Sequence, residues 1–168
     1  TKYAGKSSTE KISIIREELK KCNAKALFLS ALDEIAWTLN LRGSDVHCNP
    51  VVVSYLLIEE QHTHFFIQPQ KITPVVANYL KEIGASLHPY EEVETYLNRI
   101  NVDSLLINPA KTNYAMYSAV NPNCRIIHGA SPVTLLKAIR NEQEIAGIHA
   151  AMQRDGVAPV SYTHLRAH

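Results

Sequence analysis

The sequence lacks the long hydrophobic run of a membrane-spanning helix. Its longest nearly unbroken apolar stretch, residues 51–58, has about eight residues, whereas a span needs about 20. An excess of one charge is also missing, because 17 Lys and Arg stand against 16 Asp and Glu, and no basic stripe could contact several phosphates. We therefore expect neither a membrane protein nor a nucleic-acid-binding protein.

Cysteine is scarce, and no two cysteines have the spacing of a metal or redox motif. Cys22, Cys48 and Cys124 are odd in number, far apart in the sequence and not preceded by a secretory signal. This pattern is typical of a reducing compartment, so we expect a cytoplasmic protein. The sequence begins at Thr1 rather than at a methionine, from which we expect further residues upstream.

The common catalytic motifs are missing as well. The sequence contains no GxGxxG, GxxxxGK(S/T), HExxH or GxSxG. His62 and His64 would face the same side of a strand, but a third metal ligand at a suitable spacing is lacking. His47 and Cys48 are sequence neighbours whose side chains point apart in an extended loop, which argues against a nucleophile and base pair. We therefore predict no catalytic residue and no metal ligand in this chain.

Helical and strand patterns alternate along the sequence. Ser7-x-x-Glu10 and Ser30-x-x-Asp33 are capping boxes that predict two helix starts. Four predicted helices cover residues 7–21, 73–83, 91–100 and 113–119, and a further helix is predicted to begin at residue 30. The predicted strands cover residues 25–30, 51–58, 62–68, 86–88, 104–108 and 125–128. Strands 51–58 and 62–68 are close enough to form an antiparallel hairpin. This alternation predicts an α/β layer architecture.

The pattern changes after Gly129. Residues 131–158 predict a linker turn and then an amphipathic helix with Asn141-x-x-Glu144 as its capping box. Nothing further along the chain could cover the apolar face of this helix, which indicates the first element of a second domain. Residues 159–168 begin with a proline and lack apolar periodicity, so we expect a break at Pro159 and assign no function to this tail.

The densest group of polar residues is the loop NLRGSDVHCNP, residues 40–50, between a helix and a strand. Gly43 allows a sharp turn, and Arg42 and Asp45 could pair with each other or with a neighbouring surface. One interpretation is a structural ion pair that pins the turn. The other is that Arg42, Asp45 and His47 face the cleft of another domain.

Trp37, the only tryptophan, lies off the apolar face of the predicted helix before this loop. It could cover a core surface, which is the commoner role of tryptophan, or rim a groove. Trp37, Arg42, Asp45 and His47 are therefore the candidates for a substrate cleft or a domain interface.

Three stretches of the sequence carry a resemblance to a known family. They are YAGKSSTEKISIIREEL, ALDEIAWTLNLRGSDVHCNPVVVSYLLI and SPVTLLKAIRNEQEIAGIHAAMQRDGVA. They resemble consecutive signature regions of the cytosolic three-domain form of aminopeptidase P, the Xaa-Pro aminopeptidase family. The resemblance covers about residues 3–158, and the middle stretch is the most specific.

The resemblance implies two related α/β domains of the creatinase N-terminal type, followed by a catalytic pita-bread domain. For this chain it implies four segments: a linker, a creatinase-N-terminal-like domain with a mixed sheet and ribonuclease H-like layering, a link to a truncated catalytic domain with its first helix, and a tail without family resemblance. These segments are residues 1–8, 9–128, 129–158 and 159–168. The tail suggests a truncation or a sequence-assembly artefact.

The activity implied by the resemblance is metal-dependent removal of an N-terminal residue that precedes proline. Two divalent metal ions, usually manganese, would be held by the catalytic domain, so this chain would be a non-catalytic portion without a cofactor of its own. The implied partners are the catalytic domain, proline-containing peptides and a second copy that pairs through that domain. The alternative is a non-catalytic creatinase-like module that binds proteins or peptides.

Overall fold

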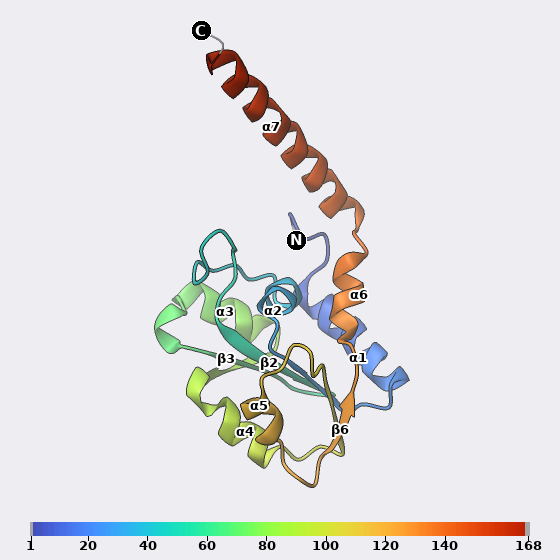
Figure 1. Ribbon diagram of the computed structural model, residues 1–168. Coiled ribbons are helices and arrows are strands. Elements are labelled where there is room, and N and C mark those ends of the chain that lie inside the picture. The colour runs from blue at the N-terminus through green and yellow to red at the C-terminus, as the bar shows by residue number, and fades with distance from the viewer. Residues whose placement is uncertain (1, 167–168) are drawn as a thin grey trace.

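Short apolar strands form the centre of the protein. The computed structural model describes residues 2–166, with side chains described as far as Val157. Thr1, and residues 167 and 168 of the predicted tail, lie outside the described residues. The strands are β1 (Ala26–Leu29), β2 (Ser54–Glu59), β3 (Thr63–Ile67), β4 (Ala85–Pro89), β5 (Ser104–Ile107) and β6 (Arg125–His128). They form one six-stranded sheet in the spatial order β4-β3-β2-β1-β5-β6 (Figure 1).

The sheet is mixed because β2 runs against its two neighbours. It pairs antiparallel with β1, with Leu27 opposite Ile58, and antiparallel with β3. The pairs β3 with β4, β1 with β5 and β5 with β6 are parallel. The predicted hairpin and the predicted mixed sheet with ribonuclease H-like layering are both confirmed.

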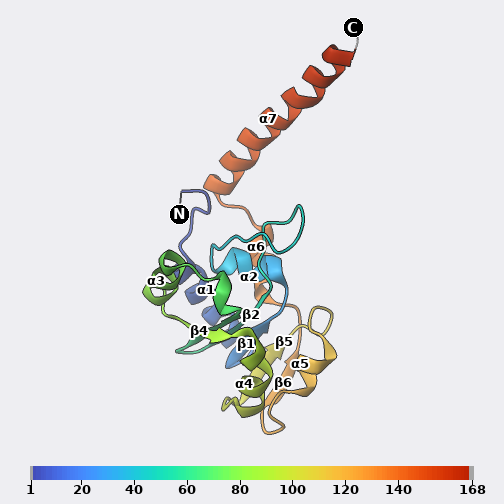
Figure 2. The ribbon, with the colours of Figure 1, turned by 90° about the vertical axis from the view of Figure 1, so that its left-hand side faces the viewer.

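Helices cover both faces of this sheet (Figures 1 and 2). One face carries α1 (Ser8–Lys21), α2 (Leu32–Thr38), α3 (Pro74–Glu82) and α6 (Pro132–Ala138), and the other carries α4 (Val93–Arg99) and α5 (Tyr114–Ser118). Two short 3₁₀ turns, η1 (Pro69–Lys71) and η2 (Tyr90–Glu92), connect the elements. The long helix α7 (Glu142–Arg166) projects away from the sheet and its covering helices.

Neighbouring residues along a strand pack into two different cores, because successive side chains point to opposite faces of the sheet. In β1, Leu27 and Leu29 face the first core, and Ala26 and Phe28 face the second. The first core, under α1, α2, α3 and α6, includes Ile12, Ile15, Leu19, Ile35, Leu39, Leu56, Ile58, Phe65, Leu80 and Val133. The second core, under α4 and α5, includes Tyr55, Leu57, Phe66, Val93, Leu97, Leu105, Ile107 and Met116. Burial on both faces explains why the strands are almost continuously apolar instead of alternating with polar residues.

One of the two predicted capping boxes at the first helices forms. Ser7 accepts a hydrogen bond from the backbone N–H of Glu10 at 3.2 Å, and the Glu10 carboxylate accepts one from the backbone N–H of Ser7 at 2.7 Å. The Ser30 box is wrong, since α2 begins after Ala31 without a side-chain cap. The Ser30 hydroxyl donates instead to the carbonyl oxygen of Lys111 at 2.8 Å, because the end of β1 lies beside the loop that follows β5.

The segment after Gly129, predicted as a linker turn, contains the additional helix α6. Val133 is fully buried in the first core, and the Thr134 hydroxyl donates to the buried carboxylate of Glu34 in α2 at 2.6 Å. Helix α6 also contacts α1. The segment is only seven residues long, too short for a clear helical periodicity, so its packing became visible only in the tertiary structure.

The predicted helix with the Asn141 cap is α7. The Asn141 side chain accepts from the backbone N–H of Glu144 at 2.9 Å, which confirms this capping box. The helix continues to Arg166, so the predicted break at Pro159 is wrong. Proline removes one backbone donor, but its fixed φ is close to the helical value. Within the described part of the chain, no helix combines the length and apolar composition needed to cross a bilayer.

The packing of α6 predicts a difference between two substitutions on the same helix. Val133→Ala should lower the free energy of unfolding by about 2 kcal/mol, because it leaves a cavity at a fully buried site. Leu135→Ala is the matched control, since Leu135 is 66% exposed, and should change it by less than about 0.5 kcal/mol. Urea unfolding followed by circular dichroism measures both. Equal effects would contradict the packing of α6 on the first core.

Candidate functional site

Trp37 lies on the last turn of α2 and connects the domain to α7. Its ring packs against the first core, and its indole N–H donates to the carboxylate of Glu144 at 3.3 Å. The ammonium of Lys11, on α1, lies 4.1 Å from the centre of the ring. Such a position over an aromatic face is attractive to a cation. Trp37 therefore serves both the core and the junction with α7.

Arg42 lies in the loop four residues after the end of α2 and contacts the last turn of that helix. Its Nη1 donates to the carbonyl oxygens of Ala36 at 3.0 Å and Leu41 at 2.7 Å. The Ala36 carbonyl lies in the last turn of α2, where carbonyl oxygens lack a partner within the helix, and it also accepts from the backbone N–H of Leu41 at 3.1 Å. Arg42 is therefore oriented by the backbone of α2, and the acid that could have paired with it, Asp45, has other partners.

Asp45 fastens the loop to its surroundings. Its Oδ2 accepts from the ammonium of Lys71 at 2.6 Å and from the backbone N–H of Val53 at 2.7 Å. The hydrogen bond from Lys71, and then that from Val53, lowers the pKa of Asp45 below its usual range. Of the two pairings that the sequence allowed, the one with a neighbouring surface occurs.

The loop turns closely over the start of β2. A side chain at Gly43 would bring its Cβ within 2.8 Å of the Cβ of Val52, so this position requires glycine. Val46 and Asn49 form an isolated bridge that closes the tip of the loop. His47 lies at this tip and is exposed. The loop is thus a fixed projection, with His47 at its outer end.

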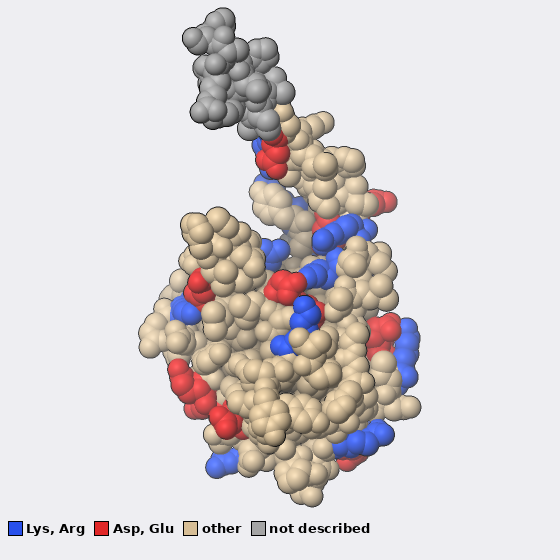
Figure 3. Space-filling view, viewed as in Figure 1, with Lys and Arg blue, Asp and Glu red and all other residues tan. Residues whose placement is uncertain are grey.

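Two hollows flank these candidates. The larger, about 730 Å³, lies between the domain and α7 and is lined by Lys2, Lys11, Trp37, Arg42, Arg140 and Glu144, among others. The smaller, about 240 Å³, is lined by Arg42, Gly43, Asp45 and Lys71 together with apolar side chains. Figure 3 shows basic and acidic side chains gathered where α7 leaves the domain, whereas in the lower half of this face the charged side chains lie mainly toward the edges. The structure therefore places Trp37 and Arg42 in one hollow and Arg42 and Asp45 in the other.

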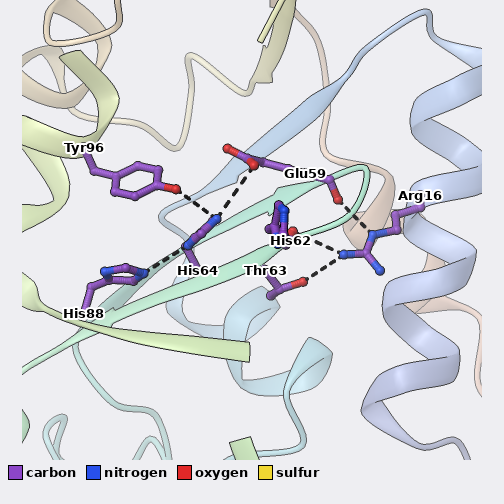
Figure 4. A network of polar contacts seen from close by, with 7 residues as sticks. All are labelled: Arg16, Glu59, His62, Thr63, His64, His88 and Tyr96. Atoms are coloured by element: carbon purple, nitrogen blue, oxygen red, sulfur yellow. Dashed lines mark hydrogen bonds and ion pairs between the residues drawn. The ribbon is translucent and has the colours of Figure 1, made fainter. Parts of the chain in front are cut away.

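A second polar cluster, which the sequence patterns did not reveal, lies on the opposite side of the sheet (Figure 4). His64 Nδ1 lies 3.0 Å from His88 Nε2, and the Tyr96 hydroxyl lies 2.9 Å from His64 Nε2. The Glu59 carboxylate is 3.7 Å from the same His64 nitrogen. His64 is only 8% exposed, so each of these partners replaces water that it has lost. These residues are far apart in sequence, so no local motif could have indicated the cluster.

The His64 cluster does not have the composition of a metal site. His62, the predicted partner of His64, is exposed, and the centres of the two rings are 6.1 Å apart. Among the described residues, no group of three or more His, Cys, Asp or Glu could hold a metal ion. The cluster joins β2, β3, β4 and α4, and its arrangement is that of a structural network.

Arg16 supports the same hairpin from the other face (Figure 4). It reaches from α1 to the turn between β2 and β3, where Nε donates to the carbonyl oxygen of Glu59 at 2.8 Å. Its Nη2 donates to the carbonyl oxygen of His62 and to the hydroxyl of Thr63, both at 3.2 Å. Burial lowers the pKa of Arg16, although a guanidinium remains charged at ordinary pH.

The His64 cluster predicts a loss of stability in acid. Burial, and then the nearby His64, lowers the pKa of His88 from its ordinary 6.5, although Glu92 opposes this shift. Below about pH 6.5 the unfolded chain therefore binds more protons than the folded one. The free energy of unfolding consequently decreases as the pH is lowered. Urea unfolding between about pH 5 and pH 7.5 measures this slope.

His88→Gln is the matched variant for that measurement, because its amide can donate to His64 Nδ1 but does not titrate. We expect this variant to fold and to show a shallower loss of stability in acid. An unchanged slope in His88→Gln would contradict the assignment of acid sensitivity to His88.

The comparisons with known proteins agree with this fold. The family model for the Creatinase/Prolidase N-terminal domain matches residues 1–144. Xaa-Pro aminopeptidase 1 of Dictyostelium discoideum is 39% identical over 163 residues, which are 96% of this chain and 26% of that protein. Xaa-Pro aminopeptidase ApepP of Drosophila melanogaster is 37% identical over 165 residues, 95% of this chain and 27% of that protein.

Solved structures show the same similarity. The X-prolyl aminopeptidase of Caenorhabditis elegans, described as a cytosolic enzyme with a di-nuclear active site, aligns with a TM-score of 0.91 and 28% identity. The alignment covers 96% of this chain and 27% of that one. The Xaa-Pro dipeptidase of Bacillus anthracis, with a TM-score of 0.63, 17% identity and coverage of 83% of this chain and 38% of that one, shares the fold alone.

The chain spans about a quarter of the length of the Xaa-Pro aminopeptidases that it matches. The matched region carries the mixed sheet, the covering helices, the candidate loop and the start of α7. On the match over residues 1–144, this chain belongs to the creatinase/prolidase N-terminal domain family.

Proposed function

We propose that this chain is the non-catalytic middle portion of a metal-dependent Xaa-Pro aminopeptidase. The observation that carries the proposal is the similarity to the Caenorhabditis elegans X-prolyl aminopeptidase, with a TM-score of 0.91 over 96% of the chain. The identity of 39% to the Dictyostelium protein supports it. In this role the domain positions the catalytic part of the enzyme and performs no bond cleavage itself.

The metal ions of the parent enzyme would be held outside this chain. The Caenorhabditis elegans relative is described as having a di-nuclear active site, whereas the described residues of this chain offer no group of ligands for a metal ion. Two metal ions acting together need several ligands that converge within a few ångströms. We propose that a downstream catalytic domain supplies them and that manganese is the metal.

The domain boundaries follow the same proposal. Residues 1–8 would be the linker from an upstream domain, residues 9–128 the creatinase-type domain, and residues 129–158 the link and the first catalytic-domain helix. Helix α6 would be the part of that link which is fastened to α1 and α2. We propose no function for residues 159–168.

The candidate residues Trp37, Arg42, Asp45 and His47 would then face the catalytic part. The larger hollow, lined by Trp37 and Arg42, opens beside α7, which would lead into that part. Asp45 and Lys71 hold the loop in a fixed position, as a stable interface would require. We propose that these residues belong to the domain interface rather than to the reaction itself.

The substrates of the whole enzyme would be peptides with proline in second position, since the relatives are named Xaa-Pro aminopeptidases. A cytoplasmic location is supported by the description of the Caenorhabditis elegans relative as cytosolic. Pairing of two copies through the catalytic domain is implied by the family resemblance alone.

A chimera tests the proposal. Residues 2–157 should replace the matched segment of Dictyostelium Xaa-Pro aminopeptidase 1 and leave hydrolysis of a Xaa-Pro peptide within about tenfold of the parent rate when manganese is supplied. The matched control carries the aligned segment of the Bacillus anthracis dipeptidase, which shares the fold but little of the interface sequence, and should be far less active. A folded but inactive chimera with this chain would contradict the proposal.

Measurements on the chain by itself distinguish the enzyme portion from the alternative of a binding module. The chain by itself should not cleave the peptide, with or without manganese, and should not bind it measurably in a calorimetric titration. Tight binding of a proline-containing peptide by the isolated chain, together with an inactive chimera, would favour the non-catalytic module.

A further inference from the structure

The incoming segment, residues 2–7, and the outgoing helix α7 meet at the C-terminal end of α2 (Figures 1 and 2). We propose that Lys11 is the centre of a lock that fastens these two segments to each other and to the domain, so that both keep one orientation. The lock consists of Lys11, Trp37, Asn40, Asn141 and Glu144. Its role in setting the angle between flanking domains rests on the proposed function, whereas the lock itself does not.

Two asparagines hold the incoming segment. Asn40 Nδ2 donates to the carbonyl oxygen of Lys6 at 3.0 Å, and Asn141 Nδ2 donates to the carbonyl oxygen of Ala4 at 2.9 Å. Asn40 comes from the end of α2, and Asn141 is the cap of α7. The segment is thus bound on one side by the domain and on the other side by the outgoing helix.

The start of α7 is held by the same residues. The Asn141 side chain accepts from the backbone N–H of Glu144, and the Glu144 carboxylate accepts from the backbone N–H of Asn141 at 3.0 Å. The other oxygen of Glu144 accepts from Trp37. A capping box that normally serves only its own helix is here tied at both residues to other parts of the chain.

Lys11 connects these contacts at their centre. It is 1% exposed, and its ammonium donates to the carbonyl oxygen of Trp37 at 2.8 Å and to Asn40 Oδ1 at 2.7 Å. A buried ammonium is unfavourable unless it is surrounded by such partners. Displacing Asn40 or Trp37 would remove one of the two hydrogen-bond acceptors of Lys11, so Lys11 favours the arrangement in which both are in place.

Gly5 shows how closely the two segments approach. A Cβ on Gly5 would lie 2.5 Å from Asn141 Oδ1, and the backbone φ of Gly5 is +71°. Further along α7 the side chains are more exposed, since Ile148 and Met152 are 44% and 67% exposed. The orientation of this helix therefore depends on its first turn and on the lock.

Spin labels can measure that orientation in the chain as it stands. Cys22 is exposed and provides one label, and Gln153→Cys provides the other on α7. Cys48→Asn removes the second exposed thiol, and asparagine suits the φ of +59° at that position. Pulsed electron paramagnetic resonance should give a narrow distribution of distances. Lys11→Met and Gly5→Ala should each widen it about twofold, because both release the first turn of α7.

Gly84→Ala is the matched control for Gly5→Ala. Gly84 has a similar φ of +73°, but no atom outside its two chain neighbours lies within 4 Å of the position of its Cβ. It should carry the same backbone strain and leave the distance distribution unchanged. The proposal is overturned if Lys11→Met and Gly5→Ala both fold and keep the narrow distribution, or if Gly84→Ala widens it equally.

A pH series distinguishes a specific role of the Lys11 charge from general packing. Burial lowers the pKa of Lys11 to about 8, with Glu144 favouring the charged form and Arg42 and Lys6 opposing it. Release of the lock would expose Lys11 and return its pKa toward 10.5, so the released arrangement binds more protons and is favoured at lower pH. The distance distribution should therefore be wider at pH 7 than at about pH 9.5 in the parent chain and should not change between these pH values in Lys11→Met. An equal change in both would overturn the role of Lys11. Because no activity is measured, a negative result leaves the proposed function standing, and an inactive chimera leaves the lock standing.

Discussion

The structure depends on a sheet that is buried on both faces. Strands β1, β2, β3 and β5 have almost no exposed side chains, so each consecutive pair of residues serves two separate cores. Apolar burial on this scale requires helices on both sides, which is why α4 and α5 are needed as well as α1, α2, α3 and α6. It also sets a strict condition for polar groups, because any that enter these layers must bring their own partners.

Two polar clusters meet that condition in different ways. The cluster of His64, His88 and Tyr96 ties strands of the sheet to α4 and contains groups that can both donate and accept. The lock around Lys11 ties α1 and α2 to segments that lie outside the sheet layers. The first cluster joins elements within the domain, and the second joins the domain to residues 2–7 and to the start of α7. In the role that we propose, which is to position other parts of an enzyme, the domain would need both properties.

Sequence patterns predicted most of the elements, since helix and strand periodicities and the caps at Ser7 and Asn141 are local signals. The Ser30 box failed because its hydroxyl finds a better partner in the distant loop after β5. Helix α6 was not predicted because Val133 is buried only through its packing against α1, α2 and the sheet, which are distant in sequence. The sequence identified the residues of the candidate loop. It did not indicate that Asp45 would pair with Lys71 and not with Arg42.

The sequence by itself determined the alternation of helices and strands, the hairpin of β2 and β3, and the family resemblance, because each of these depends on residues that are close together in the chain. The tertiary structure alone decided which side chains meet across long separations: Lys11 with Trp37 and Asn40, His64 with His88 and Tyr96, Asp45 with Lys71. The physical reason is that a buried polar group is satisfied by whichever partner the packing of the apolar layers brings within hydrogen-bonding distance, and that packing is a property of the whole fold.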